Sequence, residues 1–244
     1  MALEIGEVLE LVDETPTVKI ISIAMRNKKF YDYKPGQFFN LYLSDNSNSE
    51  NPADYKLARP YSVISSPTNK MYLEVAFKVA GVFTGRLANL KKGDKVGVNG
   101  PFGAFTFDEA GKDIVMLAGG IGITPFISTL RYATDKRLEN KFTLLYSSRF
   151  ANEVTMRNEL LRLQNENNNI KCIFTITREV AAGFEHGRID EIFLKKHAGN
   201  LSEKTFYICG AHEFILAMVE LLIKLGVDKK KIKKEDFGFV KKTN

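Results

Sequence analysis

One stretch, residues 113–125, constrains the fold more than any other part of the chain. It reads DIVMLAGGIGITP, an apolar run followed by three glycines within four residues and then a Thr-Pro pair. A short apolar run that ends at glycine is typical of a buried strand in a parallel sheet. Thr124 is a suitable N-cap for a helix, and Pro125 suits the first helical position. The stretch therefore predicts a strand, a tight turn and a helix in immediate succession.

This succession is a candidate phosphate-binding turn. Backbone N–H groups at a helix start attract phosphate, and glycines let the main chain approach a ligand closely. An ordinary strand-to-helix turn fits the stretch equally well when it is taken alone. The pattern differs from the dinucleotide-binding fingerprint, because Thr124 and Pro125 stand where a later glycine would come. It also lacks the lysine-serine pair of a P-loop.

A second block, residues 59–67, reads RPYSVISSP and has chemistry suited to a flat, phosphorylated ligand. The planar guanidinium of Arg59 can hold a phosphate through two hydrogen bonds, which a lysine cannot reproduce. Tyr61 lies two residues further on, so in a strand it points to the same side and can pack its ring against a ligand. The alternative is a hairpin strand with a surface arginine and a half-buried tyrosine.

Taken together, the two blocks resemble the ferredoxin–NADP(+) reductase-like family of flavoproteins, which are FAD- and NAD(P)H-dependent oxidoreductases. The resemblance implies that Arg59 holds a flavin phosphate and that Tyr61 packs against the isoalloxazine ring. It gives Ser62 a catalytic position, with a hydrogen bond near the redox-active N5 edge of the flavin. It also implies contacts with the nicotinamide nucleotide from residues of the glycine turn: Gly119, Gly120, Gly122, Thr124 and Pro125.

Two further blocks resemble the same family. Residues 80–90 read AGVFTGRLANL, and the resemblance implies that Gly81 and Thr84 start a short helix at the flavin pyrophosphate, with Thr84 as its cap. Residues 206–214 read FYICGAHEF, and Cys209 and Gly210 would end a strand beside the nicotinamide. Cys209 would there shape the hydride-transfer pocket as a second catalytic position. A helix cap without a ligand, and a small buried hydrophobe, are the alternatives for these two blocks.

The coenzyme and the flavin-covering aromatic are predicted from two short segments. Ser148 and Arg149 end a predicted strand, where ligands of open α/β sheets gather, and together they can receive the 2′-phosphate of NADPH. NADPH is therefore favoured over NADH; the alternative for Arg149 is a helix-flanking surface charge. Near the end of the chain, Phe237 is the first candidate for the aromatic that covers the flavin face in relatives, and Phe239 is the second; core packing is the alternative for both.

The pattern of the chain changes character near residues 108–112. Before this connector, short β-rich runs alternate with turns, which is typical of an antiparallel barrel. After it, strands alternate with helical patterns at 125–133, 153–164 and 214–225, which favours a parallel sheet flanked by helices. We therefore expect two domains, a flavin-binding antiparallel β-barrel at 1–108 and an NAD(P)-binding α/β domain at 109–244.

Composition excludes several other classes. No stretch approaches the ~20 apolar residues of a membrane span, and the N-terminus lacks the features of a secretory signal, so we expect a cytoplasmic protein. Two cysteines are too few for an iron–sulfur cluster, and the three histidines have no metal-ligand spacing. Nucleic acid is not expected, because no binding module is present. The net charge of +6 is concentrated in lysines near the C-terminus, namely Lys229, Lys230, Lys231, Lys233, Lys234, Lys241 and Lys242.

We therefore predict an enzyme that moves a hydride from NAD(P)H to bound FAD, with the two rings meeting where barrel and sheet join. FMN also fits, because a phosphate-binding arginine suits both flavins. Electrons would pass to a separate acidic carrier such as ferredoxin or flavodoxin, to which the lysine-rich end would be complementary; a solvated surface is the alternative for those lysines. Two alternative functions remain open at this point: an NAD(P)H:free-flavin reductase, and a non-catalytic flavin-binding redox subunit of a larger complex.

Overall fold

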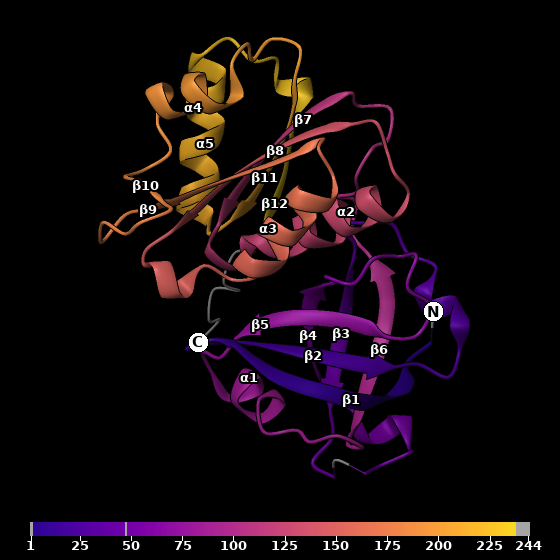
Figure 1. Ribbon diagram of the computed structural model, residues 1–244. Coiled ribbons are helices and arrows are strands. Elements are labelled where there is room, and N and C mark those ends of the chain that lie inside the picture. The colour runs from indigo at the N-terminus through magenta and orange to yellow at the C-terminus, as the bar shows by residue number, and fades with distance from the viewer. Residues whose placement is uncertain (1, 47, 238–244) are drawn as a thin grey trace. The chain divides into compact units, whose positions relative to one another are not determined.

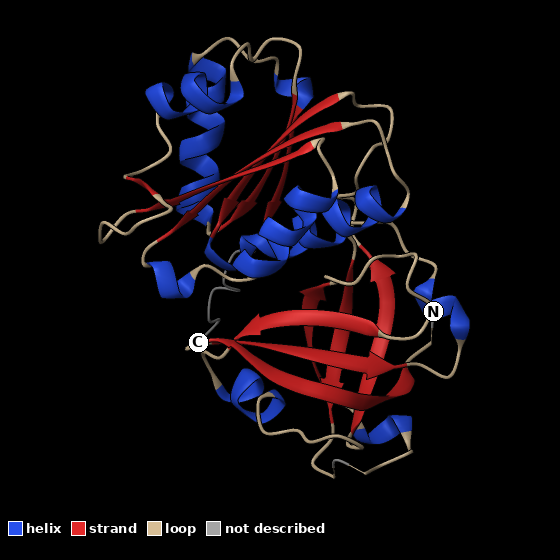
Figure 2. Ribbon diagram, viewed as in Figure 1, coloured by secondary structure: helices blue, strands red, loops and turns tan. Residues whose placement is uncertain are grey.

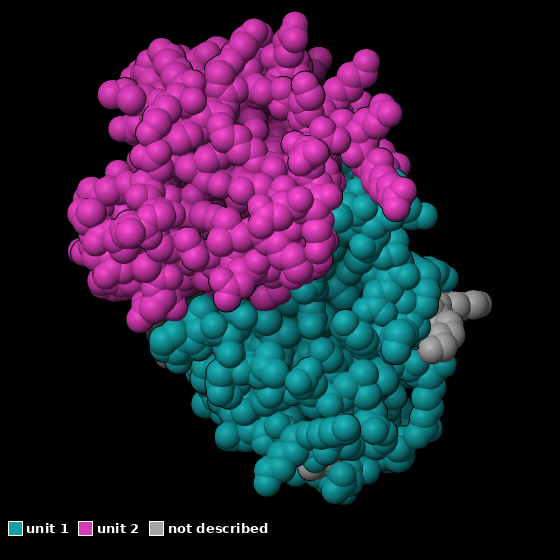
Figure 3. Space-filling model, viewed as in Figure 1, with its two compact units in different colours: residues 1–107, 124–136 teal, residues 108–123, 137–244 magenta. Residues whose placement is uncertain are grey.

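The computed structural model describes residues 2–46 and 48–237 (Figure 1). The chain forms two compact units, which Figure 3 shows in different colours. Unit 1 comprises Met1–Phe107 and Thr124–Lys136, and unit 2 comprises Asp108–Ile123 and Arg137–Asn244. Each unit contains one six-stranded sheet.

Unit 1 is built on an antiparallel sheet with the strand order β4-β3-β6-β1-β2-β5. The two outer strands approach each other, because Val63 forms a β-bridge with Val75 and the Ile64 N–H donates to the Glu74 carbonyl at 2.8 Å. The sheet thus closes on itself as the predicted barrel. Its strands are β1 (Glu4–Thr15), β2 (Val18–Ala24), β3 (Phe38–Leu43), β4 (Leu57–Ser62), β5 (Leu73–Lys78) and β6 (Lys95–Phe102).

Alternation of side chains explains how these strands enclose a core. In β3, Phe39, Leu41 and Leu43 are buried, whereas the residues between them are partly exposed. Side chains alternate between the two faces of a strand, so every second residue of β3 faces the barrel interior. Short helical segments link the strands: η1 (Lys28–Tyr31), η2 (Pro52–Asp54) and α1 (Val82–Leu87).

Unit 2 is a parallel sheet with the order β10-β9-β8-β7-β11-β12, covered by helices as predicted (Figure 2). Burial on both faces explains the continuous apolar run of β7, in which Ile114 to Ala118 are all buried. The strands are β7 (Asp113–Gly119), β8 (Lys141–Ser148), β9 (Ile170–Ile176), β10 (Glu185–His186), β11 (Thr205–Gly210) and β12 (Ile232–Asp236). The helical segments are η3 (Gly120–Ile123), η4 (Ala151–Glu153), α3 (Arg157–Glu166), α4 (Glu191–Ala198), α5 (His212–Lys224) and η5 (Lys229–Lys231).

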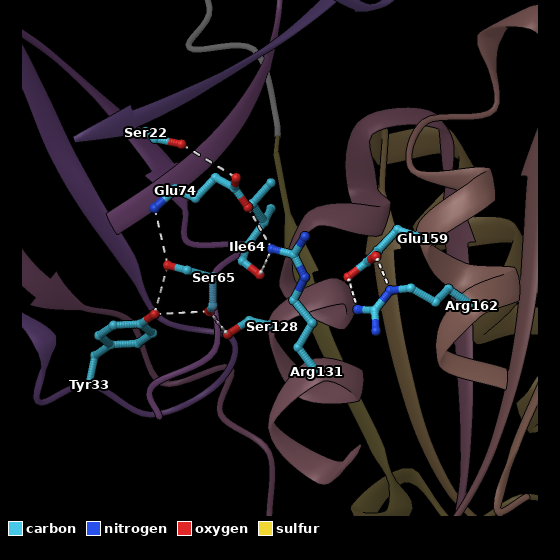
Figure 4. Close-up of polar contacts among 9 residues, drawn as sticks. All are labelled: Ser22, Tyr33, Ile64, Ser65, Glu74, Ser128, Arg131, Glu159 and Arg162. Atoms are coloured by element: carbon cyan, nitrogen blue, oxygen red, sulfur yellow. Dashed lines mark hydrogen bonds and ion pairs between the residues drawn. The ribbon is translucent and has the colours of Figure 1, made fainter. Parts of the chain in front are cut away.

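Helix α2 (Thr124–Asp135) directly follows the glycine turn, yet it packs as part of unit 1. The Ser128 hydroxyl donates to the Ser65 carbonyl at 2.8 Å, and Arg131 forms an ion pair with Glu74 of β5 (Figure 4). Thr124 begins α2 without a gap after η3. The prediction that Thr124 stands outside the helix as its N-cap is therefore wrong, because the preceding turn is itself helical.

One predicted helix begins later than expected. The apolar pattern placed its start at residue 153, but η4 ends there and α3 begins only at Arg157. Met156 has φ of 60°, in the left-handed region, so the right-handed helix cannot extend back through it. Within residues 2–46 and 48–237, we find no helix with the length and apolar character that a bilayer crossing requires.

Candidate functional site

The first part of the block at residues 59–67, which we call the flavin block, lies on β4, and its side chains contact Phe83 of α1. Tyr61 is half-buried, and its ring stacks on Phe83 with centroids 6.2 Å apart and packs edge-on against Phe77 at 6.0 Å. The Arg59 guanidinium carbon lies 5.8 Å from the Phe83 ring centroid. Alternate residues of a strand share a face, so Arg59 and Tyr61 both reach Phe83 as the spacing predicts. Ser62 ends the strand and is buried.

Arg59 retains most of its capacity to bind an anion. It is exposed, and one guanidinium nitrogen donates to the carbonyl of Ala58 at 2.7 Å. Among the described residues, none forms an ion pair with Arg59. A guanidinium has five N–H donors, so several stay available for phosphate oxygens. This donor set fits the phosphate of a flavin nucleotide.

Burial raises the pKa of Tyr61 well above its ordinary value, although the nearby Arg59 charge opposes the shift. The phenol therefore stays neutral throughout the physiological pH range. A neutral ring with one polar edge suits packing against a flat heterocycle.

Gly81 and Thr84 lie at the start of α1, but Thr84 does not cap the helix in the predicted way. Gly81 is the N-cap residue, and Thr84 is the third residue inside the helix. The Thr84 hydroxyl accepts the N–H groups of Ala80 at 2.9 Å and Gly81 at 3.0 Å. Thr84 therefore caps the helix from its third position, as in a capping box, and only the expectation that it is the N-cap residue is wrong. A Cβ atom at Gly81 would meet nothing within 4 Å, so the backbone there is open to a ligand.

Glycine is present at three positions of the turn after β7 for different structural reasons. A Cβ atom at Gly122 would lie 2.4 Å from the Cys209 carbonyl oxygen, and one at Gly119 would lie 2.9 Å from the Phe214 ring. Both positions therefore require glycine for close packing. Gly120 has φ of 53°, and a Cβ atom there would meet nothing within 4 Å. This open backbone is a fit for a ligand that approaches the turn closely.

Cys209 and Gly210 lie beside this turn, at the carboxyl end of β11. Cys209 pairs with Ala118 of β7, and Gly122 packs against the Cys209 backbone. The structure thus brings Gly119, Gly122, Cys209 and Gly210 together at adjacent strand ends, where ligands of open parallel sheets bind. Cys209 is fully buried, and burial raises its thiol pKa well above the ordinary value. Burial therefore favours the neutral thiol over the thiolate.

Ser148 and Arg149 lie at the carboxyl end of β8, as predicted. Ser148 is buried, whereas the Arg149 side chain is 59% exposed. The guanidinium of Arg149 donates to both carboxylate oxygens of Glu153, through Nε at 3.2 Å and Nη2 at 3.0 Å. Glu153 is not among the site residues predicted from the sequence. Arg149 follows β8 and Glu153 ends η4, so no helical i,i+4 pattern indicates this pair in the sequence.

Phe237 directly follows β12 and is half-buried. The second aromatic candidate, Phe239, lies outside the described residues, as do Lys241 and Lys242. Among the described residues, no three His, Cys, Asp or Glu side chains gather as metal ligands would.

Comparisons with known proteins match both halves of the chain. Residues 7–107 match the model of an oxidoreductase FAD-binding domain, and residues 116–220 match an oxidoreductase NAD-binding domain. The chain is 30% identical over 220 residues to a flavohemoprotein of Bacillus subtilis, with 87% of this chain and 53% of that protein aligned. It is also 30% identical over 201 residues to one component of the Na(+)-translocating NADH-quinone reductase of Methylococcus capsulatus, covering 74% of this chain and 49% of that protein. The chain thus spans about half the length of these two relatives.

Solved structures share the two-unit architecture. The flavohem-like FAD/NAD-binding domain of a nitric oxide dioxygenase from Vibrio cholerae superimposes with a TM-score of 0.84 at 25% identity, covering 97% of this chain and 99% of that one. A ferredoxin NADP+ reductase from Neisseria gonorrhoeae, solved with FAD and NADP, has a TM-score of 0.81 at 22% identity, covering 97% and 99%. With its FAD-binding and NAD-binding domains in this order, the chain belongs to the ferredoxin–NADP(+) reductase-like family of flavin-dependent oxidoreductases.

Proposed function

We propose that this protein is an NAD(P)H-dependent flavoenzyme that delivers electrons to a separate acceptor protein. Residues 1–108 bind FAD and residues 109–244 bind the nicotinamide nucleotide. The observation that carries the proposal is Arg59, exposed and without an ion-pair partner among the described residues, beside the neutral ring of Tyr61 within the FAD-binding domain. The flavin, when bound, supplies the redox chemistry by accepting a hydride from NAD(P)H and releasing electrons onward.

On the flavin side, each residue has a binding or orienting role. Arg59 binds a flavin phosphate through its planar fork, and Tyr61 packs against the ring system. Ser62 donates a hydrogen bond at the reactive edge of the ring. Gly81 and Thr84 give the backbone of α1 its open start at the pyrophosphate. Arg59 suits the phosphate of FMN as well as that of FAD; the match to an FAD-binding domain favours FAD.

On the nicotinamide side, the backbone matters more than the side chains. The open turn at Gly120 admits the nucleotide closely, and the tightly packed Gly119 and Gly122 fix that turn against β11. Cys209 and Gly210 shape the pocket that excludes water from the reacting ring. Thr124, Pro125 and Phe237 complete the set, with Phe237 as the aromatic that covers the flavin. No protein group has to exchange a proton in this step, which agrees with the neutral thiol of Cys209.

NADPH is the preferred coenzyme in this proposal. Ser148 and Arg149 lie together at the end of β8, and an exposed guanidinium can receive the 2′-phosphate that NADH lacks.

The electron acceptor in this proposal is a small acidic carrier such as ferredoxin or flavodoxin. The exposed side chains of Lys229, Lys230 and Lys234 support this, because clustered positive charge attracts an acidic partner. The two cysteines of this protein, Cys172 and Cys209, are free thiols, which favours the cytoplasm as the compartment of the protein.

The acceptor is tested with the purified, FAD-loaded protein. Gel filtration separates a flavoenzyme that keeps its chromophore from a free-flavin reductase, which releases the flavin. Reduction of ferredoxin and of flavodoxin by NADPH is then followed at increasing ionic strength, with free FMN as the competing acceptor. The proposal predicts a retained chromophore and a carrier-reduction rate that falls with salt. A rate with free FMN that exceeds both carrier rates, together with loss of the chromophore, would overturn it.

A further inference from the structure

We propose that Glu153 weakens the preference for NADPH by occupying two of the N–H donors of the Arg149 guanidinium. The 2′-phosphate of NADPH competes with this carboxylate for the guanidinium, whereas the 2′-hydroxyl of NADH does not. The inference rests on the proposed function, in which Arg149 receives the 2′-phosphate.

The geometry of the pair is that of a bound oxyanion. Glu153 presents one oxygen to Arg149 Nε at 3.2 Å and the other to Nη2 at 3.0 Å. Two parallel hydrogen bonds of this kind are also how a guanidinium recognises a phosphate. The Glu153 side chain is 22% exposed and the Arg149 side chain 59% exposed, so the carboxylate lies on the more sheltered side of the pair. The fork is thus engaged by the chain itself.

A second carboxylate, that of Glu179, binds a backbone N–H group in the segment that follows Arg149. Glu179 accepts the backbone N–H of Ala151 at 2.6 Å, and the Glu179 carbonyl is in turn 2.8 Å from the Nδ1 atom of His186. The Arg178 N–H donates to the Arg149 carbonyl at 3.0 Å, which joins this segment to the end of β8. The carboxylates of Glu153 and Glu179 therefore both contact the segment that begins at Arg149. Their negative charge makes this corner attract a phosphate less strongly than the Arg149 guanidinium alone would.

The two coenzymes meet this corner differently. NADPH brings a phosphate to a guanidinium that already gives two of its five N–H donors to Glu153, so competition for these donors and repulsion from the carboxylate offset part of its binding free energy. NADH carries a hydroxyl at that position, which can donate to a carboxylate and leaves the pair intact. Glu153 therefore narrows the preference for NADPH. Removing its charge while keeping its shape widens that preference.

The test is a double-mutant cycle on the FAD-loaded protein. Dissociation constants of NADP+ and NAD+ are measured by calorimetry for the wild type, Glu153→Gln, Arg149→Ala and the double variant. The Glu153→Gln variant is expected to bind NADP+ about two- to fivefold more tightly relative to NAD+, the size of one exposed ion pair. The same change in the Arg149→Ala background is expected to have no effect, because the fork is absent.

The chain offers a matched control on α3. Arg162 makes the same two-bond contact with Glu159, at 2.8 Å and 2.8 Å (Figure 4). The Glu159→Gln variant removes the equivalent carboxylate charge beside Arg162, an arginine to which no coenzyme role is given. The ratio of the NADP+ and NAD+ dissociation constants should therefore not change. A change as large as that of Glu153→Gln would show a general charge effect and overturn the inference.

The outcomes separate this inference from the proposed function. Weaker NADP+ binding in Arg149→Ala, with no change in Glu153→Gln, would overturn the role of Glu153 and leave the NADPH site standing. Unchanged NADP+ binding in Arg149→Ala would instead remove Arg149 from the NADPH site, and the inference with it. Equal tightening of NAD+ and NADP+ in Glu153→Gln would also contradict the inference, because only one of the two carries the 2′-phosphate.

Discussion

Arg131 of α2 donates to the Glu74 carboxylate of β5 at 2.5 Å, and the same nitrogen lies 3.1 Å from the Ile64 carbonyl (Figure 4). The Arg131 and Glu74 side chains are only 20% and 16% exposed. Ser128 adds a hydrogen bond from the same helix to Ser65, which also accepts the hydroxyl of Tyr33 at 2.9 Å. These contacts fasten α2 to β5 and to residues 64–65, in the second half of the block at 59–67.

Replacing Arg131 with alanine should destabilise unit 1. The change leaves the half-buried Glu74 carboxylate without its cation, which costs about 2–3 kcal/mol. We expect the melting temperature to fall by about 4–10 °C. The exposed Arg162 is the control, because its surface ion pairs contribute at most about 1 kcal/mol. Equal losses in Arg131→Ala and Arg162→Ala, measured by calorimetry, would contradict the role of the Arg131–Glu74 pair.

Replacing Gly122 with alanine should impair the nicotinamide side. The added Cβ atom would lie 2.4 Å from the Cys209 carbonyl oxygen and 2.5 Å from the Gly210 nitrogen, both backbone atoms that cannot move aside alone. We expect a lower melting temperature and weaker coenzyme binding, since small-to-large changes in packed sites cost about 1–3 kcal/mol. At Gly111 the nearest atom would be 3.4 Å away, an ordinary contact. Gly111→Ala should therefore leave both quantities unchanged, and the same behaviour in Gly122→Ala would disprove the packing argument.

Replacing Arg59 with alanine should weaken flavin retention. A charge-assisted hydrogen bond contributes about 1.5–3 kcal/mol, so the FAD dissociation constant should rise roughly ten- to a hundredfold. Fluorescence of released flavin after dialysis measures the change. Arg26, whose exposed side chain pairs only weakly with Glu50 at 3.3 Å, is the matched surface control. An Arg59→Ala protein that stays as yellow as Arg26→Ala would remove Arg59 from the flavin site.

The Glu235→Gln variant should become more stable relative to the wild type as the pH rises. Burial raises the pKa of Glu235, so the folded state favours the protonated carboxyl, and this contribution to stability is lost as the pH rises through the folded-state pKa. Glutamine has no proton to lose in this range and acquires no buried charge. The melting temperature of Glu235→Gln minus that of the wild type should therefore increase between about pH 4 and pH 7.

At Glu185 the pKa is shifted in the opposite direction, so the pH dependence of stability should have the opposite sign. The hydrogen bond from Lys196 holds the pKa of Glu185 below its ordinary value, so its ionised form favours the fold above that ordinary value. Glu185→Gln should lose stability relative to the wild type as the pH rises over the same range. A pH trend of the same sign in both variants would contradict the assignment for Glu235.

Much of the architecture can be predicted from the sequence, because it depends on local patterns of residues. Alternating apolar residues such as Phe39 and Leu41 predict barrel strands, and the continuous apolar run of β7 predicts a buried parallel strand. The glycine turn and its neighbour Cys209 were identified on separate segments, and the parallel pairing of β7 with β11 brings them together. The site assignments themselves stay predictions.

The rest depended on contacts that no local pattern encodes. Arg131 and Glu74 are 57 residues apart, so no local signal indicates that α2 packs with the barrel unit. The late start of α3 results from the left-handed backbone of Met156, a conformation that a methionine rarely adopts. Thr84 is a good N-cap by residue type, yet its hydroxyl serves the N–H groups behind it from inside the helix. In each case tertiary or backbone context overrides residue preference.

The central claim is that one chain binds a flavin and a nicotinamide nucleotide and joins them in a single redox reaction. The most direct measurement is an anaerobic titration of the FAD-loaded protein with NADPH and, separately, NADH, followed by visible absorption. We predict a retained flavin spectrum that NADPH alone bleaches rapidly, at lower concentration than NADH does. A flavin spectrum that neither coenzyme bleaches without a partner protein would indicate a non-catalytic redox subunit. A protein that remains colourless when flavin and coenzyme are both supplied would contradict the account altogether.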